Sequence, residues 1–98
     1  MADKLDGSTR VRVAPGVYAR PFGNETVLLE FGRGEYFALD EIGTEVWSRI
    51  EKGASLGQIA AEIAGAYDVS EGTALADIVA LVEDMRTRSL IEVVGSSS

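Results

Sequence analysis

Apolar and polar residues alternate along the first half of the chain and recur at helical spacing along the second half. In the segment TVLLEF, the side chains of Val27, Leu29 and Phe31 fall on one face of an extended backbone. The intervening residues fall on the other face. This period of two predicts a half-buried β-strand.

Turn residues on both sides of that strand predict an antiparallel meander. Gly23-Asn24 precedes it and Gly32-Arg33-Gly34 follows it, and both sequences tolerate the positive φ that hairpin loops need. Neighbouring strands are therefore expected at residues 17–20 and 35–39. Valines within residues 11–13 predict a further short extended piece.

Helical signals begin directly after this region. The first helix is expected at residues 41–51, with Asp40 as its N-cap. The second follows Ser55, which forms a capping box with Gln58. Gly65 inside this helix lowers its helix propensity, and we expect a close helix contact there.

The third helix is expected from its N-cap Ser70 to about Arg88. Its apolar arc is wider than one packing seam needs. One flank of this arc comprises Leu75, Ile78, Val79 and Val82, and the adjoining flank comprises Ala74, Leu81 and Met85. Asp77, Asp84 and Arg88 border the second flank and are predicted to form a polar rim.

The order of these elements defines the fold class. Three strands followed by three helices predict an α+β, winged-helix-like domain, in which a three-stranded antiparallel meander precedes a helix cluster. We expect a flexible N-terminus at 1–10, one domain at 11–94 with a short extended segment near its end, and a flexible tail at 95–98.

Composition limits the possible functions. The chain of 98 residues has neither cysteine nor histidine, which removes disulfides, the commonest zinc ligands and the commonest general base. An enzyme, a metal site and a cofactor are therefore not expected. The net charge of −7 disfavours nucleic acid and anionic membranes. No apolar run is long enough to span a membrane, so the expected location is cytoplasmic.

The two edges of the predicted meander differ in protection. Pro15 and Pro21 bracket the first strand, whereas the third, Glu35–Leu39, lacks proline, lysine and any evident cover. An unprotected edge favours pairing with a visiting strand. A second copy of the chain would be an alternative occupant of this edge.

An ordered set of residues resembles the PqqD family. An aromatic-x-leucine strand, here Phe37 and Leu39, leads into a helix with the pattern Asp-x-x-Gly-x-x-hydrophobic-Trp. In this chain the helix pattern is formed by Asp40, Gly43, Val46 and Trp47. The resemblance extends over roughly residues 11–93. Asp40 replaces the asparagine that is frequent in the family, and either residue can cap a helix.

The resemblance implies a recognition element for ribosomally synthesised, post-translationally modified peptides. Such a domain binds the leader of a precursor peptide as an antiparallel strand beside the third strand and against the third helix. Lasso-peptide maturation, with a leader peptidase and a macrocyclase as partners, is the expected pathway. The expected peptide-binding residues are Glu35, Tyr36, Phe37, Ala38, Leu39, Ala74, Asp77, Ile78, Leu81, Asp84, Met85 and Arg88.

Two other functions remain open from the sequence. The first is a chaperone that presents a pyrroloquinoline quinone precursor to a radical enzyme. The second is a winged-helix regulator that binds DNA, although the acidic third helix is unfavourable for phosphate contacts.

Overall fold

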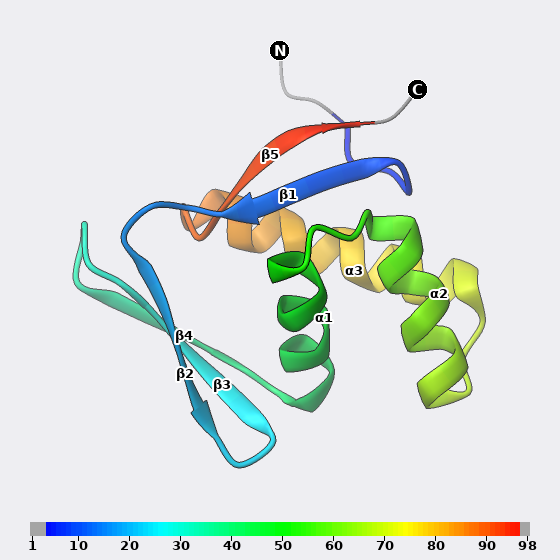
Figure 1. Cartoon of the computed structure of the whole chain (residues 1–98), viewed down its shortest axis with the longest axis horizontal. Helices are drawn as coiled ribbons and strands as arrows, with labels where there is room; N and C mark the ends of the chain where they lie inside the picture. The colour runs from blue at the N-terminus through cyan, green and yellow to red at the C-terminus, as the bar shows by residue number, and fades with distance from the viewer. Residues whose placement is uncertain (1–3, 97–98) are drawn as a thin grey trace.

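The computed structural model describes residues 4–96 and shows five strands and three helices within that range (Figure 1). The elements follow the chain as β1 (Thr9–Val13), β2 (Val17–Phe22), β3 (Glu25–Glu30), β4 (Glu35–Leu39), α1 (Glu41–Glu51), α2 (Leu56–Tyr67), α3 (Glu71–Thr87) and β5 (Ile91–Ser96). The α+β, winged-helix-like fold class is confirmed, with the predicted meander followed by the predicted helices.

The meander forms an antiparallel sheet in the order β2-β3-β4. Gly23 and Asn24 form the loop between β2 and β3, and Gly23 has a φ of +61°. In the next loop the Glu30 carboxylate accepts hydrogen bonds from the backbone N–H groups of Gly32 and Arg33. Both turns thus form where the sequence places them.

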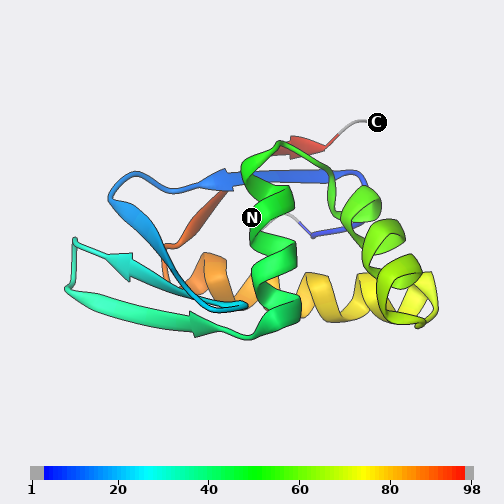
Figure 2. The same ribbon diagram turned by 60° about the horizontal axis from the view of Figure 1, so that its bottom comes forward.

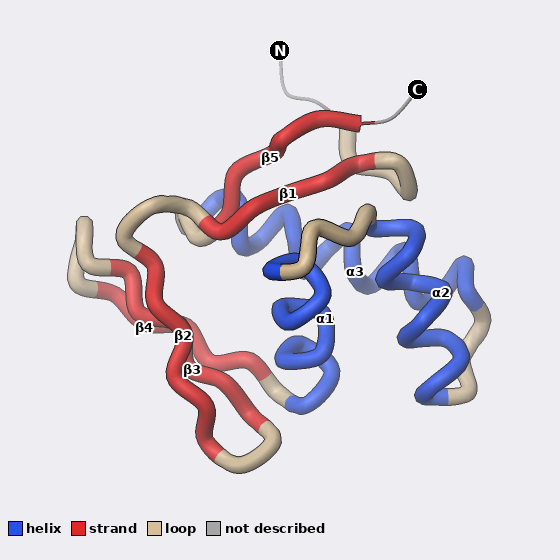
Figure 3. Tube along the Cα trace, in the orientation of Figure 1, coloured by secondary structure: helices blue, strands red, loops and turns tan. Residues whose placement is uncertain are grey.

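A second sheet joins a strand near the start of the chain to one near its end, a pairing that was not predicted from the sequence. β1 and β5 lie side by side and run antiparallel, apart from the meander (Figure 3). Leu5 is buried, and Thr9 and Arg10 belong to β1. Leu5, Thr9 and Arg10 therefore belong to the folded domain, contrary to the flexible N-terminus expected at 1–10.

The same pairing changes the expectation for the end of the chain. Gly95 and Ser96 pair with Arg10 and Thr9, so the ordered domain extends past residue 94. The final two residues of the expected tail, 97–98, lie outside the described residues, as do residues 1–3.

β3 buries the face opposite the one that its apolar residues indicate. Leu28 is fully buried and Thr26 is almost so, whereas Phe31, just after β3, is 65% exposed. The Phe31 ring instead packs on Tyr18, with 5.1 Å between their centroids. The predicted alternation of buried and exposed residues along β3 is correct. Which of its two faces is buried depends on where the helices pack.

The helices begin at the predicted caps. The carboxylate of Asp40 accepts a hydrogen bond from the Gly43 N–H at 2.8 Å, and Ser55 with Gln58 forms the capping box of α2. Ser70 caps α3, which ends at Thr87. The expected close contact at Gly65 is wrong, because a Cβ added there would meet no heavy atom within 4 Å.

The core lies between the helices and the inner faces of the two sheets. Its fully buried large side chains are Leu28, Val46, Ile50, Leu56, Ile59, Val82 and Met85. Figure 2 shows α3 passing beneath α1 and extending towards the meander. This arrangement places one face of α3 opposite β4.

Candidate functional site

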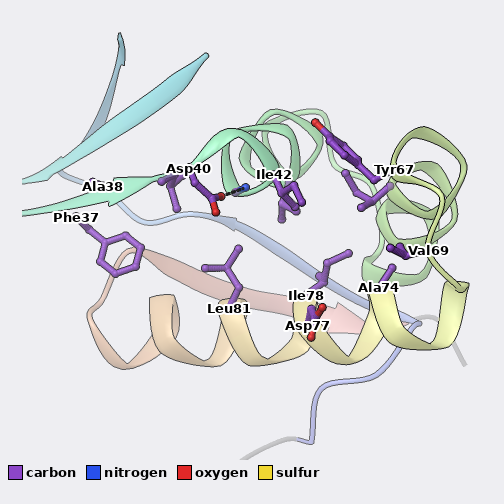
Figure 4. Close-up of a pocket in the computed structure, with 14 residues that line it drawn as sticks. Phe37, Ala38, Asp40, Ile42, Tyr67, Val69, Ala74, Asp77, Ile78 and Leu81 are labelled. Atoms are coloured by element: carbon purple, nitrogen blue, oxygen red, sulfur yellow. Dashed lines mark hydrogen bonds between the residues drawn. The ribbon is translucent and has the colours of Figure 1, made fainter. Parts of the chain in front are cut away.

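An apolar groove of about 470 Å³ lies where β4, the start of α1, the end of α2 and α3 converge (Figure 4). β4 and the following N-cap contribute Phe37, Ala38, Leu39 and Asp40, and α1 contributes Ile42, Gly43 and Val46. The remaining lining residues are Ile63, Tyr67, Val69, Ala74, Asp77, Ile78 and Leu81.

The outer edge of β4 beside this groove is free of a strand partner. β4 is the last strand in the order β2-β3-β4, so it pairs with β3 on one side alone. β5, which could have covered it, pairs with β1. Within residues 4–96, no strand pairs with the outer edge of β4.

Side chains of β4 alternate between the core face and the outer face. Phe37 pairs with the buried Leu28 and packs partly against the core, and Leu39 is buried. Tyr36 is 75% exposed and Ala38 is also exposed. Phe37 and Leu39 therefore line the groove from the core face of β4, and Ala38 also borders it.

α3 supplies the opposite wall. Ala74 and Ile78 are buried at its base, and Leu81 is half-buried one turn further along. Their spacing places all three on one helical face. In Figure 4, Leu81 rises from α3 into the groove, with Phe37 to one side of it.

A charged cluster borders the groove near the first residues of β4. The guanidinium of Arg88 lies over the Phe37 ring, 4.8 Å from its centroid. Its Nε donates a hydrogen bond to the Asp84 carboxylate at 3.2 Å. Asp84 thus holds Arg88, and Arg88 contacts the aromatic ring that lines the groove.

Negative charge surrounds the other end of the groove. The Tyr67 hydroxyl donates a hydrogen bond to Glu41 at 3.4 Å. The pKa of the Tyr67 phenol is raised by desolvation first and then by the negative charges of Glu41 and Glu45. The uncharged phenol, a hydrogen-bond donor, is therefore favoured here.

The structure brings seven of the residues predicted from sequence into this groove. They are Phe37, Ala38, Leu39, Ala74, Asp77, Ile78 and Leu81. Glu35, Tyr36 and Arg88 instead line a small adjoining cavity of about 10 Å³, which Phe37 also borders.

Two predicted site residues line neither cavity. Asp84 acts through its ion pair with Arg88. Met85 is fully buried in the core, so the structure gives it a packing role instead of a place in the groove wall. Its position on the wide apolar arc did not distinguish these two roles.

The α1 and α2 side of the groove was not predicted from the sequence. Ile42, Val46, Ile63, Tyr67 and Val69 line it but were not predicted as site residues. Tyr67 closes the apolar stripe of α2, and an aromatic residue at that position was the available signal.

The described residues include no group of His, Cys, Asp or Glu that could hold a metal ion. No helix within residues 4–96 is long and apolar enough to cross a bilayer.

Comparison with known structures gives three similar chains. TbiB1 in complex with the TbiA(β) leader peptide has a TM-score of 0.79 and 26% identity, covering 89% of this chain and 99% of that one. Lasso peptide synthetase B1 complexed with the leader peptide has a TM-score of 0.79 and 25% identity, covering 85% of this chain and 98% of that one.

The third structure is the solution NMR structure of the PqqD truncation of Methylobacterium extorquens PqqCD, a stand-alone RiPP recognition element. It has a TM-score of 0.76 and 26% identity, covering 90% of this chain and 94% of that one. A comparison with curated protein sequences gives no match.

The fold and the groove together define a winged-helix-like domain with an open sheet edge facing an apolar helix surface. The family model for coenzyme PQQ synthesis protein D (PqqD) matches residues 25–91, from the start of β3 to the first residue of β5. The chain belongs to the PqqD family.

Proposed function

We propose that this chain binds the leader segment of a ribosomally synthesised precursor peptide in the groove between β4 and α3. The observation that carries the proposal is the unpaired outer edge of β4 beside an apolar groove of about 470 Å³. Two similar structures are described as complexes with leader peptides, which supports the same role here.

The leader adds to β4 as a further antiparallel strand. Backbone hydrogen bonds to the free edge supply affinity that is independent of sequence. Alternate side chains of the leader point into the groove, where they contact Phe37, Ile78 and Leu81. Apolar side chains at every second position are thus the ones this groove accepts.

The chain acts as an adaptor without catalysis of its own. It presents the bound precursor to a leader peptidase and a macrocyclase in lasso-peptide maturation. The similarity to lasso peptide synthetase B1 supports this pathway. The groove lining supports binding over catalysis, since its ionisable side chains are Asp40, Asp77 and Tyr67 in an otherwise apolar or glycine surface.

A second pathway also has an observation in its favour. The matching family is described by its role in coenzyme PQQ synthesis, and the PqqD truncation of Methylobacterium extorquens PqqCD is similar over 90% of this chain. A chaperone for a pyrroloquinoline quinone precursor would use the same edge and groove with a different leader.

A panel of synthetic leader peptides tests the proposal and separates the two pathways. Isothermal titration with leaders of lasso precursors and of pyrroloquinoline quinone precursors should give saturable binding, with the lasso class tighter. Tighter binding of the pyrroloquinoline quinone leaders would favour that pathway over lasso-peptide maturation. Absence of saturable binding to both classes would contradict leader recognition itself.

A further inference from the structure

We propose that the end of the groove formed by α2 and the first half of α3 selects a leader with a lysine or arginine, through Asp77. This inference rests on the proposed leader binding and specifies the chemistry of the peptide. Asp77 lines the groove next to Ile78, in an otherwise largely apolar wall.

Asp77 has no partner in the described part of the chain. The acidic residues in the second half of α3 are paired, Glu83 with Arg86 at 2.7 Å and Asp84 with Arg88 at 3.2 Å. No hydrogen bond or ion pair involves Asp77 within residues 4–96. Lying in the middle of the helix, it does not cap it either. Its carboxylate is therefore available to a ligand.

The surroundings of Asp77 are predominantly negative. Arg49 lowers the pKa of Tyr67 at this end, but it is itself paired with Glu45 and Glu62. Asp40 is the other charged residue of the groove wall, and no lysine or arginine of the described chain lines it. Glu41 bonds to the Tyr67 hydroxyl at the same end. The raised pKa of Tyr67, which comes from desolvation and then from Glu41 and Glu45, agrees with a negative potential there.

The direction of the added strand sets where the basic residue falls in the leader. β4 runs from Glu35, near Arg88, to Leu39, which leads into α1. An antiparallel leader continues the pattern of this sheet, so its N-terminal part lies beyond Leu39 and approaches Asp77. The basic residue should therefore precede the apolar residues that enter between Phe37 and Leu81.

The opposite end of the groove provides a contrast within the same helix. There Arg88 is already engaged by Asp84 and by the Phe37 ring. The charges at that end already pair with each other, so a charged leader residue gains less binding energy there. The groove should therefore select a leader that carries a cation on the N-terminal side of its apolar residues.

A random peptide library displayed on phage tests this order of residues. Peptides selected on the purified wild-type chain should align on alternating apolar positions, with Lys or Arg enriched on their N-terminal side. Selection on Asp77→Asn should keep the apolar pattern and lose the basic enrichment. Selection on Asp77→Lys should favour Asp or Glu at the same place.

A synthetic peptide from the selected set gives the magnitude. Replacing its basic residue by Glu should weaken binding to the wild-type chain about fivefold at low salt, because an exposed charge pair is lost and a repulsion is gained. Binding to Asp77→Asn should change less than about twofold. The control Glu51→Gln removes one negative charge at the far end of α1 and should behave like wild type.

The outcomes separate this inference from the proposed function. Selected peptides with the apolar pattern but no preferred basic position would overturn the role of Asp77 and leave leader binding intact. The same basic preference on Asp77→Asn would also overturn it. Failure to select any peptide, with both variants folded by circular dichroism, would contradict both proposals.

Discussion

The guanidinium of Arg88 lies 4.8 Å from the centre of the Phe37 ring, and the pair joins the C-terminal end of α3 to β4 across one end of the groove. Asp84 fixes the guanidinium through a hydrogen bond at 3.2 Å. The guanidinium, fixed by Asp84, holds the Phe37 ring in place in the free chain. The groove wall is therefore preformed at this end, which reduces the ordering cost of binding.

Loss of this contact should weaken peptide binding more than it weakens the fold. Arg88→Met should reduce affinity for a leader peptide about twofold to fivefold, the effect of about 0.5–1 kcal/mol from an exposed cation–π contact. Fluorescence anisotropy with a labelled leader measures the change. Arg12→Met, which breaks the exposed Arg12–Glu92 pair of β1 and β5, is the matched control and should leave affinity unchanged. Equal losses in both variants would contradict a local role for Arg88.

Leu81 is the groove residue whose replacement best separates binding from folding. Leu81→Asp places a charge in the apolar wall and should weaken leader binding at least about tenfold, because the charge is desolvated when the peptide docks. Since Leu81 is half-buried, the variant should stay folded.

The neighbouring residue provides the control for this substitution. Ala80 is exposed, lies on the same helix and does not line the groove, so Ala80→Asp should bind like wild type. Titration calorimetry gives the affinities, and circular dichroism confirms the fold. Unchanged affinity in a folded Leu81→Asp variant would remove α3 from the binding site.

Met85 should behave as a core residue despite its place in the predicted peptide-binding set. It is fully buried, so Met85→Ala should lower the free energy of unfolding by about 2–5 kcal/mol. Leu81→Ala, at a half-buried position, should cost clearly less. Urea denaturation measures both values. A smaller loss at Met85 than at Leu81 would contradict the assignment.

The pairing of β1 with β5 should make the end of the chain necessary for stability. A chain that stops after Leu90 lacks the buried Ile91 and the partner of β1. We expect it to lose on the order of 3 kcal/mol or more of the roughly 5–15 kcal/mol available to such a domain. A chain that stops after Val94 keeps most of the pairing and should melt within a few degrees of the full chain. If the chain that stops after Leu90 melted at the same temperature as the full chain, β5 would contribute little to stability.

Local signals in the sequence were sufficient for most of the elements. The caps Asp40, Ser55 and Ser70 act through hydrogen bonds within three residues of themselves, so their effect can be read from neighbouring letters. The hairpin at Gly23-Asn24 has the same local character. These features fixed the order of the elements and, with it, the open edge at β4.

Features that depend on distant residues could not be read in this way. The partner of β1 lies at the other end of the chain, and no local pattern identifies it. Which face of β3 is buried depends on where the helices pack. For that reason the face with Leu28 is buried, and the face with Val27 is not. The same holds for Met85 and Leu81, which share an apolar flank but differ in depth once α2 and β5 are in place.

The same difference between local signals and distant packing explains why only part of the site was predicted. A strand edge and the helix that follows it carry recognisable patterns, so Phe37, Ile78 and Leu81 were found. Tyr67 and Val69 reach the groove through the packing of α2 on α3, which the sequence pattern does not specify. The missed residues make up the end at which Asp77 lies.

Amide hydrogen exchange of the free and peptide-bound chain tests the central claim most directly. The free outer edge of β4 should leave alternate amides within residues 35–39 exchanging quickly, and a bound leader should protect them through new backbone hydrogen bonds. The outer edge of β2 should be unaffected. Protection that appears on β2, or a saturating leader that leaves every amide of β4 exchanging as before, would contradict strand addition at this edge.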